Sequence, residues 1–130
     1  MTGRYAFRTG GITNQSWRPN GPGAKSADEN PVAKLLKQAG YATGMVGKWH
    51  LAKDSDQSDA GPRHSWPCQR GFDQFYGFLD GETDQFAPDL VYDNHRVDPA
   101  ATAAEGYHLS EDLVDKAIEF IHDTVSIRPD

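Results

Sequence analysis

The sequence predicts an α/β domain with an incomplete sheet. Two segments carry apolar residues at helical spacing, and the first passes through a glycine directly into an uncharged stretch typical of a buried strand. Thirteen glycines and eight prolines in 130 residues favour many turns and long loops over a helical bundle. Together these observations indicate helices flanking a sheet.

The first helix is predicted over residues 31–39. Asn30 is a good N-cap, and Pro31 suits the first helical turn, where no N–H is needed. Gly40 supplies the C-terminal stop. The apolar positions of this helix follow helical spacing: Val32, Leu35, Leu36 and Ala39. Residues 1–29 show no sustained period and predict a loop.

The first strand is predicted over residues 41–47, "YATGMVG". We expect this strand to be buried on both faces because none of its residues is charged. A polar stretch with almost no apolar content follows at 53–70 and predicts another loop.

The stretch "GFDQFYGFLDG", residues 71–81, is dense in aromatic residues and predicts a loop or short helix held in a core by its rings. A hairpin is expected after it, with strands at 90–92 and 96–97 around the turn residues Asp93 and Asn94.

The clearest helix pattern is "SEDLVDKAIEFIHDTV", residues 110–125. Ser110 is the expected N-cap, and the acidic residues at 111 and 112 suit the positive end of the helix dipole. One apolar stripe is predicted: Leu113, Val114, Ala117, Ile118 and Ile121. Two amphipathic helices with so few convincing strands suggest part of a larger domain, because an α/β domain needs several strands.

Composition excludes several classes of function. A net charge of −6 speaks against a nucleic-acid partner, because such partners need a basic surface. No apolar run approaches the roughly 18 residues of a membrane span, so no membrane association is expected. The single cysteine, Cys68, excludes an internal disulfide.

Lys48 and His50 are the candidate site residues. If the chain stays extended beyond Val46, their side chains point to the same face, because side chains alternate along a strand. They then lie at the carboxyl end of a strand, where open α/β sheets bind ligands. Lysine offers a charge and three donors to a sulfate or phosphate oxyanion, and histidine a general acid or base.

Two nucleotide-binding motifs can be excluded for this stretch, and one structural interpretation remains. A P-loop would need glycine at 42 and Ser or Thr at 49, where the chain has Ala42 and Trp49, and the glycine spacing also fails the Rossmann fingerprint. From the residues alone, a surface lysine beside a packed histidine explains the pattern equally well.

The stretch "GYATGMVGKWHL", which starts at Gly40, resembles the second signature of the type I sulfatases, G-Y-x-T-x-x-x-G-K-W-H, at every fixed position. "TGRYAFRTG" at 2–10 resembles the segment that directly follows the sulfatase nucleophile motif C-x-P-S-R. Residues 70–97 and 105–121 are similar to the middle of the large bacterial arylsulfatases. The resemblance covers nearly the whole chain and is weakest at 11–29 and 54–66.

The resemblance implies an alkaline-phosphatase-like α/β/α sandwich, present here in part, and an arylsulfatase that hydrolyses the sulfate ester of a small molecule. Members use a calcium ion and a formylglycine made from the motif cysteine. Two residues carry over by position: Lys48 to contact and bind the sulfate oxygens, and His50 to hydrogen-bond the formylglycine hydroxyl. Trp49 is expected to pack rather than to act in catalysis.

We expect residues 1–130 to be a fragment of the sulfatase catalytic domain that begins just after C-x-P-S-R. The formylglycine and the calcium ligands of the family are absent from it, so no metal ligand is assigned and the fragment alone is expected to be inactive. The alternative is a non-catalytic anion-binding or interaction module on a sulfatase scaffold. The resemblance suggests a bacterial source and leaves the compartment open between cytoplasm and periplasm.

The remaining candidates receive no catalytic role. Cys68, in "WPCQRGF", lacks the nucleophile pattern. Asp80, Glu82 and Asp84 have the alternate spacing of a calcium loop but lack the glycine and distal glutamate of an EF-hand, so solvated loop carboxylates are expected. The other histidines show no metal-ligand spacing.

Overall fold

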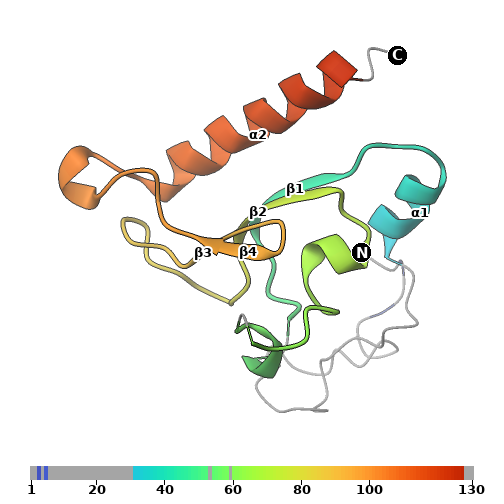
Figure 1. The fold of residues 1–130 in the computed structure, drawn as a ribbon, viewed down its shortest axis with the longest axis horizontal. Coiled ribbons are helices and arrows are strands. Elements are labelled where there is room, and N and C mark those ends of the chain that lie inside the picture. The colour runs from blue at the N-terminus through green and yellow to red at the C-terminus, as the bar shows by residue number, and fades with distance from the viewer. Residues whose placement is uncertain (1–2, 4, 6–30, 53, 59, 128–130) are drawn as a thin grey trace.

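The computed structural model describes residues 3, 5, 31–52, 54–58 and 60–127, and it contains a four-stranded mixed sheet. The strands are β1 (Gly44–Lys48), β2 (Gln74–Phe78), β3 (Leu90–Tyr92) and β4 (His95–Val97), in the order β1-β2-β3-β4. β1 and β2 run parallel, and the other two pairs are antiparallel (Figure 1). The predicted loop at 1–29 and the N-cap at Asn30 lie outside the described residues.

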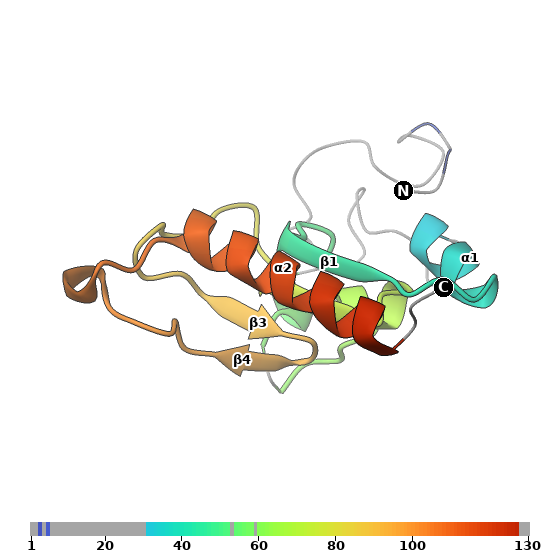
Figure 2. The same ribbon diagram turned by 90° about the horizontal axis from the view of Figure 1, so that it is seen from above.

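Helix α2 (Leu109–Ile127) crosses one face of this sheet (Figures 1 and 2). A buried cluster joins the helix to the sheet: Tyr76, Leu90, Tyr107, Leu109 and Phe120. A second cluster covers the opposite face and comes partly from the loops around two short 3-10 helices, η2 (Asp54–Asp56) and η3 (Pro67–Arg70). The predicted α/β class with an incomplete sheet is confirmed.

Helix α1 (Val32–Gln38) lies beyond the amino end of β1 and ends as predicted (Figure 2). Gly40 has a φ of 92°, and the N–H groups of Gly40 and Tyr41 donate to the carbonyls of Lys37 and Leu36, which is a Schellman motif. The buried residue of this helix is Ala33. Three of the apolar positions that follow helical spacing are 40–51% exposed: Val32, Leu35 and Leu36.

β1 differs from the prediction in position and burial. It begins at Gly44 rather than at residue 41, and it lies at one edge of the described sheet. Its three central residues are only half-buried, so the expected burial on both faces is wrong. The absence of charge in this stretch reflects close packing against β2 on one side rather than enclosure on all sides.

The aromatic stretch forms strand β2 rather than the expected loop or short helix. Phe75 is fully buried in the cluster on one face of the sheet, and Tyr76 is buried in the cluster on the other. Adjacent aromatic residues fit a strand because consecutive side chains point to opposite faces. The hairpin that follows is confirmed, with Asp93 in the left-handed conformation at a φ of 53°.

Helix α2 starts at Leu109, so Ser110 lies inside the helix and is not its N-cap. The N–H of Ser110 instead donates to Nδ1 of His108 at 3.2 Å. Much of the predicted apolar stripe is exposed, with Val114, Ile118 and Ile121 between 45% and 61% accessible, whereas Phe120 packs on the sheet.

A polar network explains this orientation of α2. The hydroxyls of Tyr76 and Tyr107 each donate to Oδ2 of Asp112 at 2.7 Å. Lys116 lies over the rings of Tyr76 and Tyr92, with Nζ 5.3 and 5.1 Å from the ring centroids. The helix therefore turns a mixed polar and aromatic face to the sheet. No helix in the described part of the chain has both the length and the apolarity to cross a membrane.

Gly77→Ala is expected to destabilise the fold by about 1–3 kcal/mol, as overpacking typically does. An alanine Cβ at this position would collide with the carbonyl group of Gly47 on the neighbouring strand. Chemical denaturation measures the loss. Gly44→Ala is the matched control, because its Cβ meets only Cδ2 of Phe120, at 3.6 Å. Equal stability of the Gly77→Ala variant and the wild type would contradict the close approach.

Candidate functional site

The candidate site lies at the carboxyl end of the parallel pair β1–β2. Lys48 is the last residue of β1 and is paired with Phe78, the last residue of β2. Its side chain is exposed. Gly47, immediately before it, has a φ of 101°, a conformation that L side chains rarely adopt. Lys48 thus lies at the carboxyl end of a strand, as expected.

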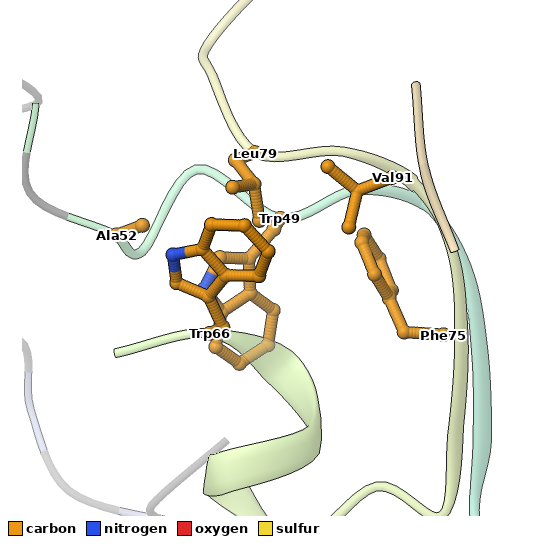
Figure 3. Close-up of a cluster of buried hydrophobic side chains, with 6 residues drawn as sticks. All are labelled: Trp49, Ala52, Trp66, Phe75, Leu79 and Val91. Atoms are coloured by element: carbon orange, nitrogen blue, oxygen red, sulfur yellow. The ribbon is translucent and has the colours of Figure 1, made fainter. Parts of the chain in front are cut away.

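Trp49 is buried, as expected, and it anchors the chain between the two candidate residues. Its indole Nε1 donates to the carbonyl of Ser65 at 2.8 Å, and its ring meets Phe72 edge-on with the centroids 6.1 Å apart. Figure 3 shows the indole beside that of Trp66 in the cluster that covers one face of the sheet. Because Trp49 lies between Lys48 and His50 in the chain, its burial in the hydrophobic core restricts the positions of both.

The chain does not stay extended through His50. The φ of His50 is 49°, in the left-handed region, and this differs from the extended geometry on which the same-face expectation depends. The N–H groups of Trp49 and His50 donate to the carbonyls of Phe78 and Leu79 at 2.9 and 3.0 Å. In a regular strand, the N–H groups of consecutive residues point to opposite sides. Here two consecutive N–H groups donate to the same neighbouring segment, so the chain turns and the direction of the His50 side chain is not that of an extended strand.

The His50 imidazole packs against the loop that follows β2. An alanine Cβ built at Gly81 would lie 2.8 Å from Nε2 of His50. Sequence analysis missed this contact, because Gly81 stands 31 positions away and the aromatic stretch that it ends gave no indication of a contact with His50. The one signal in the sequence is the triplet "LDG", residues 79–81, because Asp-Gly after a strand favours a turn.

The acidic residues of this loop hold its backbone. Oδ1 of Asp84 accepts the N–H groups of Phe86 and Ala87 at 2.7 and 2.9 Å, and these hydrogen bonds lower the pKa of the Asp84 carboxyl. Oδ1 of Asp80 accepts the N–H of Gly81 at 2.6 Å. Asp80, Asp84 and Glu82 are all exposed, in agreement with the expectation of solvated loop carboxylates.

Calcium does not fit the described residues. They contain no group of three or more His, Cys, Asp or Glu side chains that could hold a metal ion. A hollow of about 60 Å³ beneath the loop is lined by several polar side chains, among them Asp80, Asp89 and Arg96. Arg96 is already engaged there, with the carbonyl of Gln57 at 2.7 Å.

A larger hollow among the described residues lies away from the candidate residues. It measures about 650 Å³ and opens between β1 and α2, and neither Lys48 nor His50 lines it. Its walls are mainly apolar and include Met45, Phe120 and Ile121. We interpret it as the gap between a helix and an edge strand, because no cationic side chain lines it to receive an anion.

Cys68 has the environment of an unreactive thiol. Burial, together with the carboxylate of Asp93, whose Oδ1 lies 3.8 Å from Sγ, raises the pKa of the Cys68 thiol to about 12. The thiolate is the nucleophilic form, so little of it is present near neutral pH.

Comparison with known proteins identifies relatives for nearly the whole chain. A model of the sulfatase family matches residues 1–129. Human arylsulfatase G is 33% identical over 106 residues, which cover 82% of this chain and 18% of that protein. Human arylsulfatase D and human steryl-sulfatase are 37% and 39% identical over 81 and 84 residues, each covering 59% of this chain. The chain thus spans 13–18% of the length of these relatives.

Solved structures share the fold. The crystal structure of Ps i-CgsB superposes with a TM-score of 0.76 at 24% identity, covering 98% of this chain and 30% of that one. The structure of the same protein in complex with k-i-k-neocarrahexaose gives a TM-score of 0.72, also at 24% identity, covering 96% and 29%.

Native Cys68 is expected to react with iodoacetamide at pH 8 at least about tenfold more slowly than in the urea-unfolded chain, because its raised pKa leaves less thiolate. Asp93→Asn removes a negative charge and should speed the native reaction. The rate is measured by mass spectrometry of the alkylated chain. A native thiol that reacts as fast as the unfolded one would contradict this environment.

Proposed function

The chain belongs to the sulfatase family, and on that premise we propose that it carries the lysine and the histidine of the sulfate site of a sulfuric ester hydrolase, an arylsulfatase. Residues 1–130 form part of the catalytic domain, and the whole protein hydrolyses the sulfate ester of a small molecule. The observation that carries the proposal is the coincidence of the sulfatase signature with the carboxyl end of β1, where Lys48 is exposed.

Lys48 binds the sulfate oxygens. An ammonium group is a compact charge with three donors, so it can neutralise an oxyanion without requiring a planar, two-pronged geometry. Of the positions around it, Trp49 is buried and Gly47 carries no side chain, so Lys48 supplies the charge at the end of β1.

His50 acts on the oxygen of the nucleophile. Its imidazole is half-buried beside Gly81, a position from which a ring nitrogen can exchange a hydrogen bond with a hydroxyl. The nucleophile of the family is a formylglycine, which supplies the hydroxyl that attacks sulfur. The only cysteine of this chain, Cys68, lacks the motif that is converted to formylglycine.

The chain alone therefore binds sulfate and does not hydrolyse esters. A lysine and a histidine can orient and charge-balance a sulfate, but without a nucleophile no covalent step is available to them. No step is assigned to calcium, because the described residues offer no site for it.

Lys48→Ala is expected to weaken sulfate binding by about tenfold or more, the equivalent of losing one hydrogen bond to a charged group. Binding is followed by NMR titration of the 130-residue chain with sodium sulfate at constant ionic strength. Lys34→Ala is the control of equal charge, since Lys34 is an exposed lysine on α1, before the amino end of β1. Equal weakening by both substitutions would show a non-specific charge effect and contradict the proposal.

The purified chain is expected to release no more product from 4-nitrophenyl sulfate than the Lys48→Ala variant does. Colorimetric detection of nitrophenol over hours provides the test. Turnover above that control would overturn the inactivity of the isolated chain. Tight, Lys48-dependent sulfate binding together with a cooperative thermal transition would favour an anion-binding module in its own right.

A further inference from the structure

The backbone of His50 is held on two sides. Its N–H donates to the carbonyl of Leu79 at 3.0 Å, and the preceding residue, Trp49, is bonded to Phe78 and Ser65. The φ of 49° places it in the left-handed region, which few residues other than glycine adopt and in which asparagine, aspartate and histidine are the most frequent of these. With the backbone fixed in this way, the torsions of the side chain decide where the imidazole nitrogens lie.

Gly81 limits those torsions. An alanine Cβ at this position would lie 2.8 Å from Nε2, 3.0 Å from Cε1 and 3.3 Å from Cδ2 of His50. The first distance is shorter than real Cβ contacts, so the Nε2 end of the ring occupies the volume that a methyl group would need. The glycine is itself held, because its N–H donates to Oδ1 of Asp80.

The glycine at 81 is required for space and not for backbone conformation. Gly81 is absent from the residues with positive φ, whereas Gly77 and Gly71, earlier in the chain, are among them. An alanine can therefore adopt the backbone of residue 81 without strain. The three atoms nearest to the new methyl group all belong to the ring of His50, so the effect of Gly81→Ala on the folded state acts mainly on that ring. A small stabilisation from the lower entropy of the unfolded chain adds to it.

We propose that Gly81 is a positioning residue for His50: by having no side chain, it lets the imidazole settle against the loop after β2 and so sets the place of Nε2. This inference rests on the proposed role of His50 in the sulfate site. The proposed site then includes the loop after β2 as well as the end of β1. Residue 81 helps to set the position from which Nε2 of His50 hydrogen-bonds the nucleophile oxygen.

The test is Gly81→Ala in the full 130-residue chain, read by NMR of the histidine side chains. His50 is assigned with His50→Gln, and His95 and His122 serve as internal references. The ring signals of His50 should shift in Gly81→Ala while those of the references stay in place. The response to sulfate should weaken as much as it does in His50→Gln. Gly44→Ala, whose Cβ makes only an ordinary contact, should leave the His50 signals unchanged.

A double-mutant cycle checks the contact without any ligand. Gly81→Ala should lower the Tm in the wild-type background relative to its effect in His50→Ala, where the ring that the methyl group displaces is absent and the lower entropy of the unfolded chain leaves the Tm unchanged or slightly raised. Unchanged His50 signals, or equal Tm losses in both backgrounds, would overturn the inference. Absence of sulfate binding in the wild type, with the His50 signals still moved by Gly81→Ala, would overturn the proposed function and support the positioning of His50 by Gly81.

Discussion

The close approach of β1 and β2 at Gly47 and Gly77 is the constraint on which the rest of the structure depends. The two glycines are partners in the parallel register, and the position of a side chain at 77 is already taken by the Gly47 backbone. Close backbone contact of this kind requires glycine. It brings the residues after Lys48 beside the residues after Phe78. Segments about thirty residues apart in sequence therefore lie together at the carboxyl end of the parallel pair.

The three residues after Gly47 differ in exposure, and this difference places the two candidate side chains on either side of a buried one. Lys48 is exposed, Trp49 is 5% exposed and His50 is half-buried. The buried indole belongs to a cluster with Trp66, Phe75 and other apolar side chains (Figure 3). Groups that bind a ligand need a rigid support, and the packed core that holds Trp49 would give such support to the proposed site at Lys48 and His50.

The pattern of residues predicted the helices, the hairpin and the strand end that carries Lys48, because each of these depends on local spacing. It did not predict which helical faces are buried. On α2 the aliphatic positions Ile118 and Ile121 are exposed, whereas Phe120, Asp112 and Lys116 face the sheet. A hydrophobic period shows that a helix has an apolar face, but the rotation of α2 follows from the hydrogen bonds that Tyr76 of β2 and Tyr107, just before the helix, donate to Asp112.

The sequence by itself determined the α/β class, the resemblance to sulfatases and the identity of Lys48 and His50 as candidate residues, because all three lie in contiguous stretches with a local signature. The tertiary structure alone decided that the aromatic stretch is a strand, that His50 leaves the extended conformation and that its imidazole packs on Gly81. These features arise from contacts between residues about thirty positions apart. Local spacing carries no information on them, since the space available to a side chain depends on which distant backbone lies beside it.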